Sequence, residues 1–161
     1  MEHGVKPATQ SGATRRQAFV ASFGIRALEP DLDLNALLAQ AAAHAAAGLG
    51  VERTTVLQHR PDTEDLLLRA GVGWKPGVVG RATLPTSMAS PPGRAFQTGV
   101  AVMLEDVRTA GDFEWSSLLR EHGVVSLLNV PVRVPGRAAW GVLEVDTEVP
   151  RRFGREHEHF F

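Results

Sequence analysis

Carboxylates and histidines at short spacing are the residues of this sequence that could perform metal chemistry. Glu105 and Asp106 precede a loop that ends near Asp112, and such a group could bind a divalent cation through its oxygen atoms. Residues of this type more often cap turns and helices, and Asp112 is expected to cap the helix that follows it. His157 and His159 are not expected to share a metal, because residues two apart point to different sides of a helix.

A second pair of carboxylates, Glu144 and Asp146, stands two residues apart within an apolar run that predicts a strand. Because side chains alternate between the two faces of a strand, both carboxylates belong to one face. We expect this face to be exposed to solvent, or its carboxylates to pair with Arg133 across the hairpin.

The sequence lacks the residue patterns of several enzyme classes. It contains no cysteine, so thiol nucleophiles, thiolate metal ligands, disulfides and thioether-linked cofactors are excluded. It also has no G-x-S-x-G motif, no H-E-x-x-H motif and no glycine loop with the spacing of the known nucleotide-binding motifs. We therefore predict that the chain is not an enzyme, has no catalytic residues, and carries neither a metal nor a cofactor.

Aromatic side chains are concentrated in an irregular segment, residues 73–122, which glycine and proline break into short pieces. Long excursions of this kind are commonly functional, and aromatic walls with a few polar groups are typical of small-molecule pockets. Arg94 stands out, because an inward-pointing guanidinium needs an anionic partner or ligand. The alternative is that these side chains only fill a second core. The predicted ligand-binding residues are Trp74, Arg94, Phe96, Phe113, Trp115 and His122.

The elements that must position these residues are short helices and hairpins. The clearest helix covers residues 33–49, where apolar residues recur at helical spacing between a capping Asp33 and an exit at Gly48 or Gly50. A two-turn helix is expected between the cap Ser90 and the stop Gly99. Further helices are expected at 14–28, at 114–122 and from 155 onward, and strands at 53–59, 64–72, 101–104, 124–134 and 139–147.

Length and charge limit the organisation of the chain. A chain of 161 residues is expected to form one domain, which we place at 31–161, after a disordered lead (1–12) and an N-terminal helix (13–30). Consecutive hairpins and flanking helices predict an α+β fold with an antiparallel sheet. The net charge of −1 gives no case for nucleic-acid binding, and no apolar run predicts a membrane span or a signal peptide, so a cytoplasmic protein is expected.

Several blocks of sequence, taken in order, resemble a GAF domain of the type found at the input end of bacterial sensor histidine kinases. No single block is diagnostic, but their order is specific, and together they cover about residues 31–161. The blocks are Leu66–Trp74, Gly80–Thr83, Gly93–Gly99, Glu105–Arg108, Leu119–Val124, Asn129–Val132 and Trp140–Val145.

The resemblance implies a central antiparallel sheet of five or six strands, with the helix at 33–49 and the terminal helices on one face. The irregular segment would close a ligand pocket on the other face. GAF domains bind cyclic nucleotides, tetrapyrroles, haem or small metabolites, or bind nothing and dimerise. This sequence lacks the bilin-attaching cysteine, the three cysteines of the methionine sulfoxide reductase members and a recognisable cyclic-nucleotide signature. A covalently attached bilin, the methionine sulfoxide reductase reaction and cyclic-nucleotide binding are therefore not expected.

We expect a module of a bacterial signal-transduction protein that senses an unknown small molecule, specifically the input of a histidine kinase whose output domain follows this chain. The alternative is a dimerisation module whose pocket is filled by its own side chains. In either case a homodimer is expected, because Phe19, Phe23 and Leu28 of the N-terminal helix need a partner surface. The helices at 33–49 and from 155 onward would complete this interface. Without cysteine or an evident axial histidine, the purified protein should be colourless.

Overall fold

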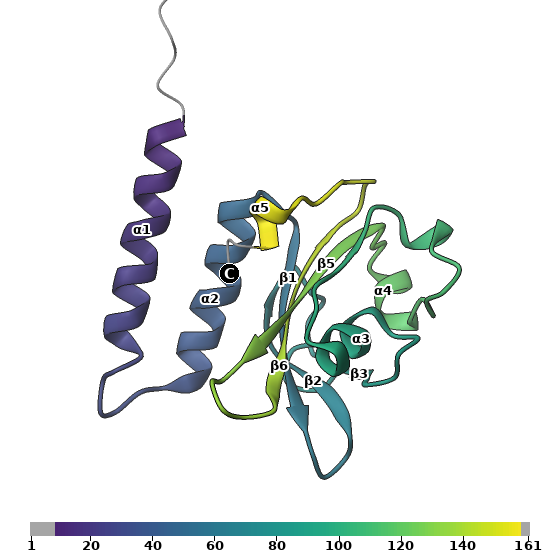
Figure 1. Cartoon of the computed structure of the whole chain (residues 1–161), viewed down its shortest axis with the longest axis horizontal. Helices are drawn as coiled ribbons and strands as arrows, with labels where there is room; N and C mark the ends of the chain where they lie inside the picture. The colour runs from purple at the N-terminus through teal and green to yellow at the C-terminus, as the bar shows by residue number, and fades with distance from the viewer. Residues whose placement is uncertain (1–8, 159–161) are drawn as a thin grey trace, which may run out of the picture.

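The centre of the structure, a computed structural model that describes residues 9–158, is a six-stranded antiparallel sheet (Figure 1). The strands lie in the order β3-β2-β1-β6-β5-β4, so β1 and β6, far apart in sequence, are neighbours in the middle. The predicted α+β fold is confirmed. The strands are β1 (Arg53–Arg60), β2 (Asp65–Val72), β3 (Thr83–Pro85), β4 (Val102–Leu104), β5 (Ser126–Arg133) and β6 (Ala139–Thr147).

Helix α2 (Leu34–Leu49) covers one face of the sheet and begins and ends as the sequence predicts. The Asp33 carboxylate accepts hydrogen bonds from two backbone N–H groups of the first turn, at 3.0 and 3.2 Å. Gly50 adopts a φ of 59°, which lets the chain leave the helix. The C-terminal half of α2 forms an apolar core with Leu128 and Val145 of the sheet, and Phe153, just before α5 (Arg155–Glu158), closes that core.

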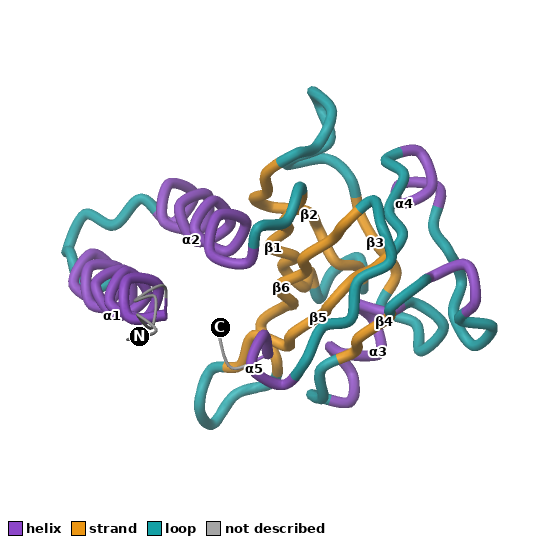
Figure 2. The backbone as a smooth tube through the Cα atoms, turned by 90° about the horizontal axis from the view of Figure 1, so that it is seen from above, coloured by secondary structure: helices purple, strands orange, loops and turns teal. Residues whose placement is uncertain are grey.

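Helix α1 (Thr9–Arg26) lies beside α2 and packs against it (Figures 1 and 2). It begins earlier than predicted, so residues 9–12, expected to belong to the disordered lead, form its first turn. Residues 1–8 and 159–161 lie outside the described residues, as does the side chain of Phe19. The packing on α2 leaves Val20, Ile25 and Leu28 65, 70 and 84% exposed, respectively.

The irregular segment covers the opposite face of the sheet with short helices (Figure 2). Helix α3 (Pro91–Thr98) agrees with the prediction: the Ser90 hydroxyl accepts a hydrogen bond from the Gly93 N–H, and Gly99 ends the helix at a φ of 65°. The segment also contains β3, which the sequence did not predict, and the 3-10 helix η1 (Val107–Thr109).

Helix α4 (Ser117–Glu121) is shorter than the predicted 114–122, and its cap is Ser116 rather than Asp112. Ser116 has extended backbone geometry, and its hydroxyl accepts a hydrogen bond from the Leu119 N–H at 3.3 Å. The Glu114 N–H donates instead to the Ala89 carbonyl at 2.8 Å, which holds the chain before α4 against the turn before α3.

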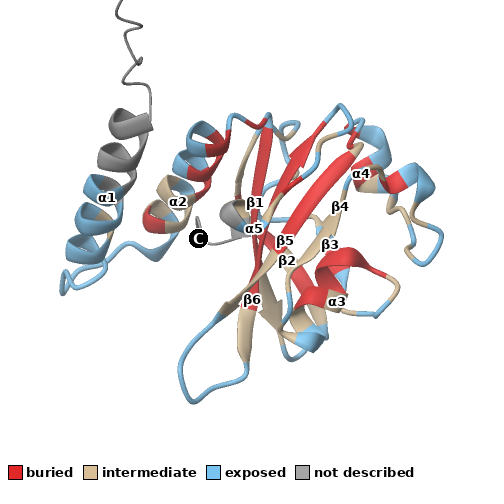
Figure 3. Ribbon diagram, turned by 45° about the horizontal axis from the view of Figure 1, so that its top comes forward, coloured by how far each residue is buried: buried red, intermediate tan, exposed pale blue. Residues whose placement is uncertain are grey.

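The middle strands are buried on both faces, which Figure 3 shows as the red centre of the sheet. On β6, Leu143 and Val145 belong to cores on the α2 side, while Val142 belongs to the core under the irregular segment. Each face of β6 must therefore supply side chains that suit an interior. Among the described helices, none is both long enough and apolar enough to cross a membrane, and the predicted cytoplasmic location stays a prediction.

Candidate functional site

Five polar residues face the irregular segment from the three central strands, and we call them the carboxylate cluster: Arg53, Thr55, Asn129, Glu144 and Asp146. The strand register brings them together. Glu144 on β6 lies opposite Thr55 on β1 and Asn129 on β5. Two residues further along β6, Asp146 lies opposite Arg53. The cluster is thus built on the rigid middle of the sheet rather than on loops.

The position of Glu144 and Asp146 corrects the sequence prediction, which placed them in solvent or beside Arg133. Both residues are 0% exposed. Arg133 instead donates a hydrogen bond to the Gly99 carbonyl at 2.8 Å. The physical reason is topological: β6 is a central strand covered on both faces, so its second face is not the solvent face that a hairpin at a sheet edge would have.

The polar atoms of the cluster have few partners in the described part of the protein. Both oxygens of Glu144 and Asp146, both side-chain amide atoms of Asn129 and the Thr55 hydroxyl make no hydrogen bond of normal length and angle, although the Asn129 amide acts on Glu144 as a weak donor. Thr55 and Asn129 are, like the carboxylates, 0% exposed. A buried polar group without a partner costs about 1–3 kcal/mol, and more when it is charged. Native proteins rarely gather several such groups in one place, which marks the cluster as a candidate site.

Burial changes the acid–base behaviour of the two carboxyl groups. It raises the pKa of Glu144 to about 7, although the Asn129 side chain opposite acts in the other direction. Burial also raises the pKa of Asp146 well above its ordinary value; the neighbouring Glu144 adds to this shift and Arg53 opposes it. Near neutral pH the pair therefore holds protons that two exposed carboxylates would have released.

Arg53 is the basic member of the cluster and is 6% exposed. Its Nη2 donates to the carboxylate of Glu148, which lies half-exposed just beyond β6. Its Nε and Nη1 are buried and make no hydrogen bond. The guanidinium carbon lies 5.9 Å from the centre of the Trp74 ring, so this tryptophan borders the cluster. One nitrogen of the guanidinium is committed, and two remain available.

Two cavities lie under the irregular segment, and Trp115 and Leu119 line both. The larger, of about 280 Å³, lies between the start of α3 and the stretch 114–120. Trp115 also packs against the apolar core that contains Leu127, the β5 neighbour of Asp146. The Trp115 Nε1 is buried without a hydrogen-bond partner. Neither cavity is lined by the carboxylates, so a ligand that reaches them must displace part of the irregular segment.

The other predicted ligand-binding residues have contacts within the protein. The Arg94 guanidinium carbon lies 4.0 Å from the centre of the Phe113 ring. Arg94 also donates from Nε to the Met88 carbonyl at 2.9 Å and from Nη2 to the Asp112 carbonyl at 3.5 Å. Arg94 thus joins two loops of the irregular segment through neutral acceptors, and no anionic partner is needed to explain its position.

His122 and Phe96 also contribute to packing. The His122 Nε2 accepts a hydrogen bond from the Lys75 N–H at 3.3 Å, so Nδ1 carries the proton and donates to the Leu118 carbonyl at 2.8 Å. Both ring nitrogens are therefore used by the fold. The half-buried Phe96 ring lies 4.5 Å from the ring of His59, centre to centre. Trp74, which borders the carboxylate cluster, contacts the His122 ring at 4.8 Å, centre to centre. Phe113 and Trp115 both line the smaller cavity.

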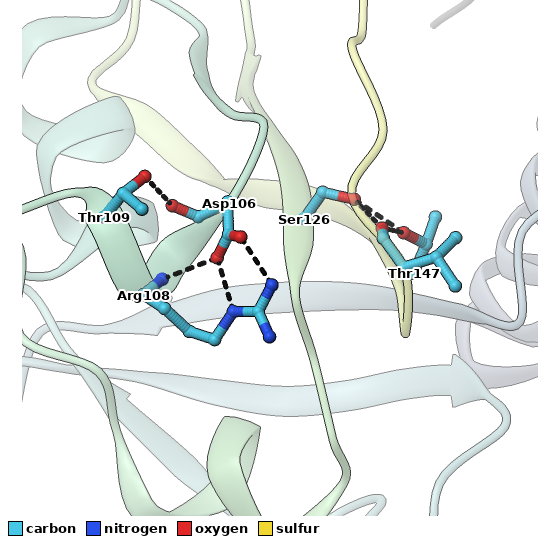
Figure 4. Close-up of polar contacts among 6 residues, drawn as sticks. Asp106, Arg108, Thr109, Ser126 and Thr147 are labelled. Atoms are coloured by element: carbon cyan, nitrogen blue, oxygen red, sulfur yellow. Dashed lines mark hydrogen bonds and ion pairs between the residues drawn. The ribbon is translucent and has the colours of Figure 1, made fainter.

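The loop after β4, considered above as a cation site, is held by an internal ion pair (Figure 4). The Asp106 carboxylate accepts hydrogen bonds from the backbone N–H, Nε and Nη2 of Arg108, at 2.9, 2.8 and 2.6 Å. The Arg108 guanidinium lowers the pKa of Asp106. Asp106 therefore caps η1 rather than offering free oxygens to a metal. Within residues 9–158, no group of three or more histidine, aspartate and glutamate side chains is placed to hold a metal ion.

Sequence reasoning did not single out Arg53, Thr55 and Asn129, and it assigned Glu144 and Asp146 to the wrong environment. One signal was available. The helices predicted at the two ends of the chain and the irregular segment between the hairpins must lie on the two faces of the sheet, so both faces are covered. Two acidic residues at i, i+2 on a strand buried on both faces then predict interior carboxylates. The strand order that makes β6 central could not be obtained from the periodicity.

A family model of the GAF domain matches residues 33–161, which include every member of the carboxylate cluster. The chain belongs to the GAF domain family. GAF domains are small-molecule-binding modules, and the match confirms that the sequence resembles a GAF domain. No curated protein matches the chain.

Solved structures show the same fold. The GAF domain from Acinetobacter phosphoenolpyruvate-protein phosphotransferase is 22% identical and has a TM-score of 0.76, with 94% of this chain and 86% of that chain covered. The corresponding GAF domain from Coxiella burnetii is 16% identical, with a TM-score of 0.78 and coverage of 92% and 84%. Free methionine-R-sulfoxide reductase from Neisseria meningitidis, in complex with its substrate, is 23% identical, with a TM-score of 0.72 and coverage of 99% and 89%.

Proposed function

We propose that this GAF domain is the small-molecule-sensing module of a bacterial signal-transduction protein and that its ligand binds at the carboxylate cluster. The observation that carries the proposal is the set of fully buried polar side chains without hydrogen-bond partners on the sheet face under the irregular segment. Such groups destabilise the folded state unless something binds to them. A ligand that supplies the missing partners would restore those interactions.

The architecture supports coupling between binding and signalling. The polar groups stand on rigid strands, while the segment that covers them consists of short helices and loops. A ligand at the cluster must move or reorder that cover, which can bias two states of the domain. Two structural neighbours are GAF domains from phosphoenolpyruvate-protein phosphotransferases, so this fold occurs within larger proteins with another activity. The resemblance to the input domains of sensor histidine kinases favours a kinase as the partner activity here.

Binding rather than catalysis is the role we propose. A structural neighbour, the free methionine-R-sulfoxide reductase from Neisseria meningitidis, was solved with its substrate, so the fold can hold a small molecule and can act on one. The present sequence has no cysteine, and the resemblance associates that reaction with three cysteines. The absence of enzymatic activity stays a prediction.

A thermal-shift screen of the full chain against a metabolite library tests the proposed function. A ligand that binds only the folded state raises the melting temperature by about 5–10 °C at roughly 100-fold excess over its Kd. The shift should disappear in Asn129→Leu, which removes one buried polar member of the cluster, and persist in Glu105→Gln, which changes an exposed carboxylate.

Native mass spectrometry of the purified protein completes the test, because it detects a ligand that the library omits. The proposal fails if no compound shifts the melting temperature and no bound mass accompanies the protein. It also fails if a ligand binds equally well to the Asn129→Leu variant.

Dimerisation without a ligand is the second candidate function, and α1 favours it. Val20 and Ile25 on α1, and Leu28 after it, are largely exposed, and a second copy of this surface around a two-fold axis would cover them. Light scattering should then show a dimer for the full chain and a monomer for Val20→Glu/Ile25→Glu. Gln17→Glu, an exposed change on the same helix, is the control. A full-length chain that is monomeric would contradict the dimer.

A further inference from the structure

We infer that Arg53 couples the carboxylate cluster to residues 148–153, the segment through which the chain leaves β6 and which we call the exit segment. The Arg53 guanidinium pairs either with Asp146 inside the cluster or with Glu148 at the start of the exit segment, and the charge on Asp146 determines which. The inference rests on the proposed function and adds the route by which the state of the site reaches the C-terminal part of the domain.

Two carboxyl groups compete for one guanidinium. Arg53 lies opposite Asp146 in the strand register, and its Nη2 donates to the carboxylate of Glu148. Its Nε and Nη1 are buried and, like both oxygens of Asp146, make no hydrogen bond with any described residue. Glu148 follows Asp146 by two residues, a spacing of about 7 Å in extended chain, so a guanidinium with five N–H donors can reach either group. In the structure it is paired with the outer one.

The stem of the Arg53 side chain is held in place, so an exchange of partners needs only a movement of the guanidinium. Gly73 leaves room for the stem, because a Cβ at that position would lie 2.8 Å from the Arg53 Cγ. The Trp74 ring borders the guanidinium, with its centre 5.9 Å from the guanidinium carbon. A rotamer change at the end of a long side chain requires no rearrangement of the backbone.

The charge on Asp146 sets the preference between the two partners. Asp146 is 0% exposed, and burial together with the neighbouring Glu144 raises its pKa well above the ordinary value. A protonated Asp146 needs no ionic partner, which agrees with the observed pairing to Glu148. Once Asp146 ionises, leaving it unpaired costs far more than leaving Glu148 unpaired, because Glu148 is half-exposed and water solvates it. The guanidinium then turns inward and releases Glu148.

The exit segment connects Glu148 to helix α2 and to α5. Arg151 donates from Nη1 to the Gly50 carbonyl at 3.2 Å and from Nη2 to the Leu49 carbonyl at 2.8 Å, both at the C-terminal end of α2. Phe153 is buried in the core that α2 forms with the sheet, and α5 follows it. A change at Glu148 therefore acts on the start of a segment whose other end is attached to α2. The cluster and α5 are linked through a side chain with two arrangements.

Other titratable groups near the guanidinium have to be distinguished from Asp146. Glu144 shares a face of β6 with it, and its pKa of about 7 places its ionisation in the neutral range. On the irregular segment, the His122 ring lies 4.8 Å from the Trp74 ring, centre to centre, and Lys75 follows that tryptophan. Glu52 is exposed and precedes the arginine on the chain. The experiment below separates these groups by substitution.

An NMR titration of the full chain without any ligand tests the coupling. It follows the Arg53 Nε–H signal and the backbone amides of the exit segment from about pH 5.5 to about pH 8.5. Both sets of signals should move together, with a midpoint of about pH 7. Neither should move in Glu144→Gln/Asp146→Asn, because this double variant keeps the guanidinium on Glu148.

Glu148→Gln tests the same coupling from its other end, at a half-exposed position. It removes the competing carboxylate, so Arg53 stays with the cluster. The carboxyl groups of Glu144 and Asp146 should then ionise about one pH unit lower, a roughly tenfold loss of proton affinity, which their carboxyl carbon signals measure. Glu52→Gln removes an exposed carboxylate next to Arg53 and is the matched control, which should leave this midpoint unchanged.

The coupling is wrong if the exit segment stays fixed while the Arg53 signal moves, or if Glu148→Gln leaves the midpoint unchanged. Movement that persists in the double variant would assign the titration to His122 and would also overturn the inference. These outcomes do not decide the proposed function, because the thermal shift that depends on Asn129 measures binding at the cluster and not its transmission to the exit segment.

Discussion

Two buried polar clusters occupy opposite faces of the same pair of strands, and they differ in how their hydrogen bonds are satisfied. On the α2 side, the hydroxyl groups of Ser126 and Thr147 lie 2.6 Å apart, and both lie within hydrogen-bond distance of the Val149 carbonyl (Figure 4). One hydroxyl donates to the carbonyl, and the other donates to the carbonyl or to its neighbour. We call this the hydroxyl cluster. On the other side, Glu144 and Asp146 are equally buried, and their oxygens make no hydrogen bond within the described residues.

The contrast separates buried polar groups that stabilise the fold from buried polar groups that are arranged for a ligand. The hydroxyl cluster is complete within the chain, so it stabilises the chain's turn after β6 in any condition that preserves the fold. The carboxylate cluster is incomplete and includes ionisable groups, so it destabilises the ligand-free domain in a pH-dependent way. Functional sites commonly reduce stability in this manner, because the groups are arranged for a ligand rather than for each other.

The largest effect that would test this contrast is expected from Arg53→Met. This change keeps the apolar stem but removes the positive charge that faces Asp146 and binds Glu148. Breaking a buried ionic contact costs about 3–5 kcal/mol of unfolding free energy. The loss should be greater at about pH 8 than at about pH 5, because the carboxyl groups are then ionised to a greater extent.

Urea denaturation of Arg53→Met at both pH values measures that difference. Arg60→Met is the control on the same strand, because Arg60 pairs with Asp65 at a partly exposed position and its loss should cost much less. Equal costs for the two arginines would remove the distinction between the cluster and an ordinary surface pair.

The unchanged protein should itself lose stability as the pH rises through the mildly acidic range. Because the pKa of Glu144 is about 7 in the folded state and near 4.5 when unfolded, the folded state binds more protons between these values. The ionisation of Glu144 should lower the unfolding free energy by on the order of 3 kcal/mol between about pH 4.5 and about pH 7. Asp146 shifts in the same direction.

Denaturation curves across this pH range provide the measurement. Asp65 and Asp106 have lowered pKa values, so their contributions are lost only below the ordinary range of an aspartate and fall outside the window. An unfolding free energy that rises from about pH 5 to pH 7 would contradict the raised pKa values of Glu144 and Asp146.

Removing one hydroxyl from the satisfied cluster should have a smaller effect that does not depend on pH. Thr147→Val keeps the shape of the side chain but loses its hydrogen bonds to Ser126 and to the Val149 carbonyl. The expected cost is about 1–2 kcal/mol, equal at about pH 5 and pH 8. Thr109→Val, at an exposed hydroxyl, should stay within about 0.5 kcal/mol of the unchanged protein. If the loss of unfolding free energy in Thr147→Val depends on pH, the distinction between the two clusters is wrong.

The tryptophans offer the smallest and most closely matched comparison. The Trp74 Nε1 donates to the Thr54 carbonyl at 3.1 Å, whereas the Trp115 Nε1 is buried without a partner. Trp74→Phe should therefore cost about 1 kcal/mol more than Trp115→Phe, because only the former leaves a carbonyl unsatisfied. Thermal unfolding of the two variants side by side measures the difference. Equal or reversed costs would show that Trp115 serves the fold as Trp74 does.

Local chemistry made much of the fold predictable. Caps such as Asp33 and Ser90 act within one turn, and the alternation of apolar residues identified the hairpins, so these elements were found from the sequence alone. Predictions failed where the outcome depended on distant partners. The short strand β3 forms because β2 offers an edge, and α4 starts late because Glu114 bonds to Ala89 instead.

The candidate site was only partly predictable for the same reason. The irregular segment and its aromatic residues were identified correctly as the cover of one sheet face, and Trp115 was placed among the ligand-binding candidates. The polar groups that the cover hides come from β1, β5 and β6, and their meeting depends on the strand order and register. A periodic pattern shows that Glu144 and Asp146 share a face, but not which face of the finished sheet that is.

The most direct test of the account is the stability of the Glu144→Gln/Asp146→Asn double variant without any ligand. Both substitutions keep the size of the side chains and remove their ability to ionise. If the carboxylates are arranged for a ligand, the double variant should be more stable than the unchanged protein at about pH 8, by on the order of 2–3 kcal/mol, and similar to it at about pH 5. A double variant that is less stable at both pH values would show that the carboxylates hold the fold together, and would contradict the account.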